Sequence, residues 1–89
     1  MGNASVKIKI MPISPSVNLK EIEDKAKIVI EKHKGKILNI IQEPIAFGLK
    51  AVILTFLITE EFEQDPLTVA LQKIPNVNSA EVIDFRRAI

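Results

Sequence analysis

The chain has 89 residues, a net charge of +1 and no cysteine. This length supports one modest hydrophobic core, so we expect residues 1–89 to form a single domain. The absence of cysteine excludes disulfides, thiolate nucleophiles and cysteine-based metal sites, and it favours a cytoplasmic protein. A net charge near zero gives no long-range attraction to nucleic acid or to an anionic membrane, so we expect neither as a direct partner.

The first half of the chain predicts a strand, a helix and a second strand. Residues 5–13, SVKIKIMPI, alternate apolar and lysine positions, which is typical of a strand with one buried face. Residues 18–35 predict an amphipathic helix, with Asn18 as its N-cap and Gly35 as the C′ residue that ends it. Residues 36–44, KILNIIQEP, predict a second strand that stops at its final proline.

The second half predicts a strand, a helix and a last strand. Residues 49–59, LKAVILTFLIT, are apolar without alternation, which indicates a central strand buried on both faces. This run is far shorter than the roughly 20 apolar residues that a membrane helix needs. Residues 65–74 predict a helix with Asp65 as its cap and Pro66 as its first residue. Residues 79–89, SAEVIDFRRAI, predict a short final strand.

The predicted order β-α-β-β-α-β indicates an α+β domain of the ferredoxin-like plan, a four-stranded antiparallel sheet with two helices on one face. The first and third strands are central in this plan. Because helices cover only one face, the third strand must also present apolar side chains to the open face. That surface is either an apolar interaction patch or dimer seam, or it is covered by long side chains such as Lys7 and Lys9.

The sequence assembles no catalytic or metal-binding constellation. His33 is the only histidine, and its place at the end of an apolar helix stripe favours a packed or capping role over general base catalysis. The acidic residues Glu60, Glu61, Glu63 and Asp65 lack the spacing of a calcium loop and indicate a solvated loop. We therefore expect no enzyme activity, no metal and no cofactor.

The segment AFGLKAVILTF faintly resembles the RNP1 motif of RNA-recognition domains, which stack bases on aromatic side chains of the central strands. Tyrosine and tryptophan are absent, and Leu49 stands where that motif would place an aromatic residue. A small RNA-binding or regulatory module is therefore the alternative function.

Three segments, MPISPSVNLKEIEDK, QEPIAFGLKAVIL and VIDFRRAI, resemble the archaeal elongation factor 1-beta family. The likeness spans Val6 to Ile89, and its specific part is the block from Pro44 to Lys50. The resemblance implies a ferredoxin-like fold and a guanine-nucleotide exchange factor, which promotes GDP release and GTP loading on elongation factor 1-alpha in protein synthesis. The implied partner is this G protein in its GDP-bound and nucleotide-free states.

In such a factor, Pro44 and Gly48 would hold a turn in one shape, so that Phe47 is presented to the partner without a large ordering cost. The implied contact residues are Pro44, Ile45, Ala46, Phe47 and Gly48. The alternative is that Phe47 folds inward and closes the end of the core.

The C-terminus departs from the eukaryotic pattern, in which the residue before the last is a lysine thought to reach the magnesium and phosphate region of the G protein. Here Ala88 occupies that place and no lysine follows Lys73. Arg86 and Arg87 are the cations near the end, and we include them as candidate contacts. Their alternative role is that of solvated charges on the last strand, with side chains on opposite faces.

Overall fold

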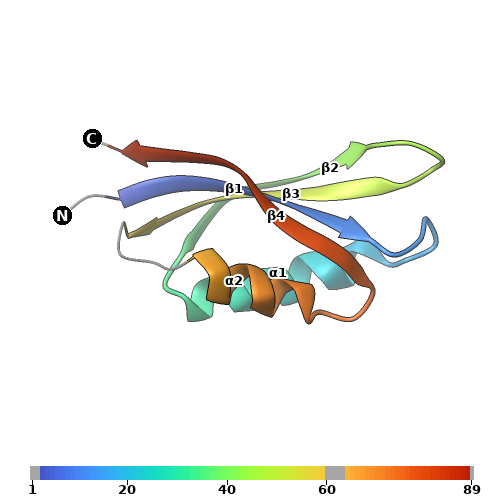
Figure 1. The fold of residues 1–89 in the computed structure, drawn as a ribbon, viewed down its shortest axis with the longest axis horizontal. Coiled ribbons are helices and arrows are strands. Elements are labelled where there is room, and N and C mark those ends of the chain that lie inside the picture. The colour runs from blue at the N-terminus through green and yellow to red at the C-terminus, as the bar shows by residue number, and fades with distance from the viewer. Residues whose placement is uncertain (1–2, 60–63, 89) are drawn as a thin grey trace.

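The computed structural model describes residues 3–59 and 64–88. Its element order is β-α-β-β-α-β, as predicted, and the acidic residues Glu60, Glu61 and Glu63 lie outside the described residues. The elements are β1 (Asn3–Pro12), α1 (Leu19–Lys32), β2 (Lys36–Pro44), β3 (Lys50–Thr59), α2 (Gln64–Gln72) and β4 (Val77–Ala88) (Figure 1).

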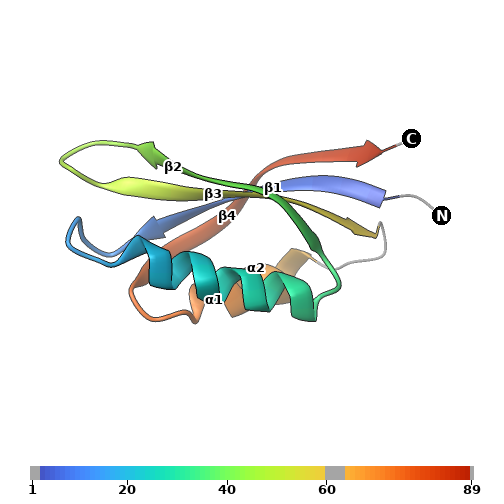
Figure 2. The same cartoon turned by 180° about the vertical axis from the view of Figure 1, so that it is seen from behind.

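All neighbouring strands are antiparallel, and they follow the order β2-β3-β1-β4, so that β1 and β3 are central. Both helices pack on the same face of this sheet (Figure 2). The ferredoxin-like prediction is therefore confirmed. Among the described residues, no helix is long and apolar enough to cross a membrane.

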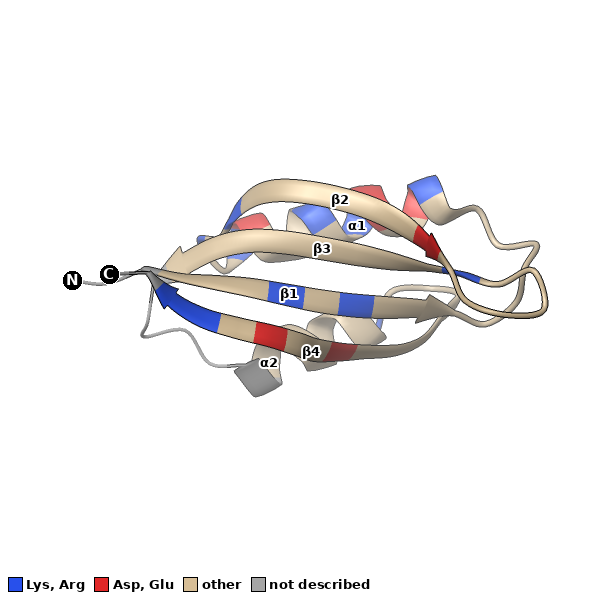
Figure 3. Cartoon of the chain, turned by 90° about the horizontal axis from the view of Figure 1, so that it is seen from above, with Lys and Arg blue, Asp and Glu red and all other residues tan. Residues whose placement is uncertain are grey.

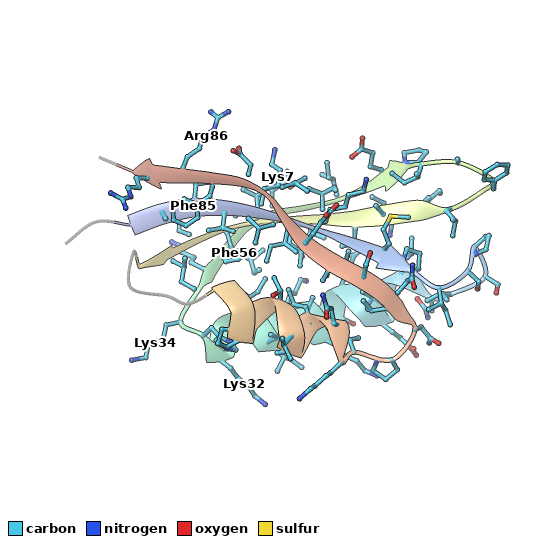
Figure 4. The ribbon with its side chains drawn as sticks, viewed as in Figure 1. Lys7, Lys32, Lys34, Phe56, Phe85 and Arg86 are labelled. Atoms are coloured by element: carbon cyan, nitrogen blue, oxygen red, sulfur yellow. The ribbon has the colours of Figure 1, made fainter. Side chains whose placement is uncertain are left out.

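The core lies between the sheet and the helices. Val6 is paired with Phe56, and Ile8 with Leu54, so alternate residues of the two central strands share the covered face. These side chains are fully buried, and Figure 4 shows Phe56 directed toward the helices. The helices contribute buried apolar residues to the same cluster, namely Ile22, Ala26, Ile30, Leu67 and Leu71.

The open face is divided between an apolar and a charged half. Ile53 is only 3% exposed although no helix covers it, because Lys9 and Ile41 flank it in the cross-strand register. Ile41 remains about half exposed, so the predicted apolar patch is confined to the β2 side. On β1 and β4, the register places Lys7 opposite Asp84 and Lys9 opposite Glu81, a pattern visible in Figure 3.

The observed ends of the helices agree only in part with those predicted from the sequence. The Asn18 side chain accepts a hydrogen bond from the Lys20 amide at 3.0 Å, so the predicted cap of α1 is confirmed. The prediction of Gly35 as the left-handed C′ residue is wrong, because Lys34 takes that position with a φ of 65°. The second helix begins at Gln64, one residue before the predicted cap Asp65.

Gly35 is instead required by close packing. A Cβ atom on Gly35 would lie 2.6 Å from the Cγ2 atom of Ile30 and 3.3 Å from the ring of Phe56. The Gly35 amide donates to the Ile30 carbonyl at 2.9 Å, and the Lys34 amide donates to the Glu31 carbonyl at 3.0 Å. These two bonds form a Schellman motif that turns the chain from α1 directly into β2.

Both edge strands have irregular registers. The register of β2 skips Leu38, and the register of β4 skips Asn78 and Ile83. Leu38 and Ile83 are apolar and about half exposed, which accounts for two of the large hydrophobic side chains on the surface.

Candidate functional site

The β2–β3 hairpin ends in a turn whose shape is fixed by its backbone. The Ile45 amide donates to the Leu49 carbonyl at 2.8 Å, and the Leu49 amide donates to the Ala46 carbonyl at 2.9 Å. Phe47 and Gly48 have φ angles of 54° and 80°. Positive φ at both central residues is the requirement of a type I′ turn, whose twist matches that of the flanking strands.

Phe47 projects from this turn into solvent. Its side chain is 95% exposed, which excludes the alternative that it closes the end of the core. A left-handed conformation costs a residue other than glycine about 1–2 kcal/mol. The hairpin therefore holds a large apolar ring in solvent at the centre of a strained turn, an arrangement that contributes nothing to the core.

Other exposed apolar side chains lie at the same end of the molecule. Ile13, in the loop between β1 and α1, is 59% exposed, and Ile45 of the hairpin is 41% exposed. The Ile13 amide donates to the Asn76 carbonyl at 2.9 Å, which ties this loop to the turn that precedes β4. The sequence interpretation missed Ile13, whose signal was an isoleucine between two prolines at the end of a strand.

The structure separates the predicted site residues into two groups. Pro44 to Gly48 form the hairpin, whereas Arg86 and Arg87 lie near the end of β4, at the opposite end of a molecule 42 Å long (Figure 1). Arg86 is paired with Ser5, and its guanidinium lies 3.1 Å from the Asp84 carboxylate. Figure 4 shows Arg86 projecting from the open face of the sheet.

His33, the only histidine, has a structural role. The Nδ1 atom of His33 lies 2.9 Å from the Val29 carbonyl, so the ring caps the end of α1 as expected. Among the residues that the structure describes, no group of histidine and carboxylate side chains could hold a metal ion.

Comparison with known proteins identifies the family. The model of the EF-1 guanine nucleotide exchange domain matches residues 5–88. The chain belongs to this family. It is 41% identical to elongation factor 1-beta of Methanosarcina barkeri, covering 98% of this chain and 99% of that protein. It is 42% identical to elongation factor 1-beta of Methanocaldococcus jannaschii, covering 99% and 100%. Membership confirms the prediction of a guanine-nucleotide exchange factor.

A solved structure supports the fold of this exchange domain. The C-terminal domain of the MgtC protein from Mycobacterium tuberculosis has a TM-score of 0.65 over 99% of this chain and 88% of that chain. The two sequences are only 10% identical, so this likeness concerns the fold alone.

The open face of the exchange domain does not favour the RNA-binding alternative. RNA-recognition domains stack bases on aromatic side chains that the central strands expose on this face. Here the corresponding positions within the described parts of β1 and β3 hold Ser5, Lys7, Lys9, Met11, Ala51, Ile53, Thr55 and Leu57.

Proposed function

We propose that residues 1–89 act as a single exchange-factor domain that binds elongation factor 1-alpha in the cytoplasm and promotes the release of its GDP. The family membership and the relatives named elongation factor 1-beta support this partner. The observation that carries the proposal is the 95% exposed Phe47 on a fixed turn. We assign this residue as the anchor of the complex.

Exchange makes and breaks no covalent bond, so its mechanism is a difference in binding. A factor that binds the nucleotide-free G protein more tightly than the GDP-bound form must weaken GDP binding by the same ratio. Each tenfold of weakening requires about 1.4 kcal/mol of differential contact. The contact residues of this domain must therefore fit a conformation of the partner that holds GDP poorly.

Phe47 is suited to supply part of that energy. Complete burial of a phenylalanine side chain contributes about 1.5–3 kcal/mol, and a ring that is already exposed loses no intramolecular contact when it enters a partner. The hydrogen bonds of the hairpin restrict the backbone before binding, so little ordering cost remains. Ile13 and Ile45 would surround the anchor and exclude water from it.

The arginine end has a secondary role in this proposal. Ser5 and Ala4 lie on opposite faces of β1, so their partners Arg86 and Arg87 also lie on opposite faces. At most one guanidinium can face the phosphate region of the G protein. A single exposed charge of this kind mainly alters the association rate and its salt dependence.

Release of a fluorescent GDP analogue from the cognate elongation factor 1-alpha tests the proposal. We expect release to accelerate with increasing concentration of the exchange domain and to reach a plateau. An unchanged release rate at micromolar concentration would contradict the function.

A further inference from the structure

A groove of about 500 Å³ lies between the β1–α1 loop, the first turn of α1 and the β2–β3 hairpin. This volume is within the range of about 300–1,000 Å³ that is typical of ligand pockets. Pro12, Pro15 and Val17 form part of its wall, and Gly48 contributes from the hairpin. Because Gly48 follows Phe47 in the turn, the groove begins beside Phe47.

The walls of the groove are held by hydrogen bonds. The hydroxyl groups of Ser14 and Ser16 lie 3.1 Å apart within the loop. The side-chain amide of Gln42 donates to the Glu23 carboxylate at 2.8 Å, which joins β2 to α1 next to the groove. A Cβ atom on Gly48 would lie 3.8 Å from the Cβ atom of Pro15, so the loop and the hairpin are close neighbours.

The charged residues that line the groove are all basic. Lys20 and Lys50 line the groove, and both are exposed. Among the lining residues in the described part of the chain, none is acidic, and the nearby Glu23 carboxylate is engaged by Gln42. The lining combines apolar residues such as Pro12, Pro15 and Val17 with two cations. This combination is complementary to a chain segment that carries an acidic side chain beside an apolar one.

We infer that this groove is a second docking site, which binds an extended acidic segment of the G protein while Phe47 is buried in the same partner. The inference rests on the proposed function and names a further contact within it. The occupant is assigned by charge and by position, because a protein surface that surrounds Phe47 extends directly over the groove. The two contacts would share one interface, with the hairpin between them.

Filling the groove without changing charge tests this inference. Ser14→Trp places a large side chain in the groove, whereas Ile28→Trp introduces the same side chain at an exposed position of α1 outside the lining. We expect Ser14→Trp to raise the Kd for nucleotide-free elongation factor 1-alpha by about tenfold, which corresponds to about 1.4 kcal/mol. Ile28→Trp should leave the Kd within about twofold, because Ile28 does not line the groove. Thermal melting verifies that both variants fold, and equal Kd values would overturn the inference.

A charge reversal tests the occupant. Lys20→Glu with Lys50→Glu should raise the Kd by at least about tenfold at physiological salt, because it repels an acidic segment. Lys25→Glu with Lys27→Glu makes the same change in net charge on exposed positions of α1 and should have a smaller effect. Equal effects of the two pairs would indicate long-range steering and would contradict a groove-bound segment. Inorganic phosphate provides a further probe: saturable shifts of the Lys20 and Gly48 amide resonances, with no effect of Ser14→Trp, would make the groove a small-anion site and overturn the inference.

Failure of the groove can be distinguished from failure of the proposed function. Binding of the wild-type domain without accelerated GDP release would reject the exchange function, and the Kd comparison would still test the groove. Normal exchange with unchanged binding of Ser14→Trp would reject the groove alone. Absence of wild-type binding would reject both.

Discussion

Arg86 and Arg87 point to opposite faces of the sheet, because Arg86 is paired with Ser5 and Arg87 with Ala4. We expect the double substitution Arg86→Ala with Arg87→Ala to weaken binding to the G protein while a substantial maximal exchange rate remains. Saturation kinetics on the single and double variants measure both quantities. A maximal rate at the uncatalysed level with binding retained would assign GDP release to the tail instead of the hairpin.

Replacement of Phe47 by alanine should lower exchange strongly while the fold stays intact. Loss of about 1.5–3 kcal/mol of apolar burial corresponds to roughly a tenfold to hundredfold fall in exchange efficiency. The cooperative melting transition should persist, because the side chain is 95% exposed. Ile28→Ala, which removes an exposed apolar side chain from α1, is the matched control and should exchange normally. A Phe47→Ala variant with full exchange activity would reject the anchor.

We expect substitutions of Gly48 to destabilise the domain through the backbone conformation of this residue. A Cβ atom there has space, since its nearest neighbour would be 3.8 Å away, but the φ of 80° is unfavourable for alanine. Gly48→Ala should therefore lower the free energy of unfolding by about 1–2 kcal/mol. Gly48→Asn should cost less, because asparagine tolerates the left-handed region. Denaturant titrations would measure the difference, and equal losses would argue against a conformational cause.

Lys34 and Gly35 should respond in opposite directions. Lys34→Gly removes the strain of a φ of 65° and should raise the free energy of unfolding by about 1 kcal/mol. Gly35→Ala forces a methyl group to 2.6 Å from the Ile30 side chain and should lower it by about 1–3 kcal/mol. Melting curves of the two variants provide the test, and a stabilised Gly35→Ala variant would contradict the packing explanation.

The order of the elements and the central position of β3 followed from periodicity and apolar content, which are local properties of the chain. The position of the left-handed residue at the end of α1 could not be predicted in this way. It depends on how closely Gly35 packs against Ile30 and Phe56. Glycine is favoured both by positive φ and by close packing, and the sequence does not distinguish the two causes.

The sequence indicated which segment forms the candidate site, but it did not indicate which side chains share the exposed surface there. The proline and glycine around Phe47 indicated a fixed turn, yet its exposure depends on where the hairpin ends relative to the helices. The position of Ile13 depends on tertiary contacts, because its backbone hydrogen bond to Asn76 joins loops far apart in the chain. The separation of the hairpin from Arg86 likewise requires the sheet topology.

The bulges at Leu38 and Ile83 also bear on how the domain behaves at high concentration. An outer strand with a regular row of free N–H and C=O groups is a template on which another chain can add a strand, the first step toward aggregates. Leu38 interrupts that row on β2 and Ile83 interrupts it on β4, so both outer strands of the sheet carry an obstacle to strand addition. The domain can thus keep an apolar hairpin exposed to solvent while its own edges discourage polymerisation.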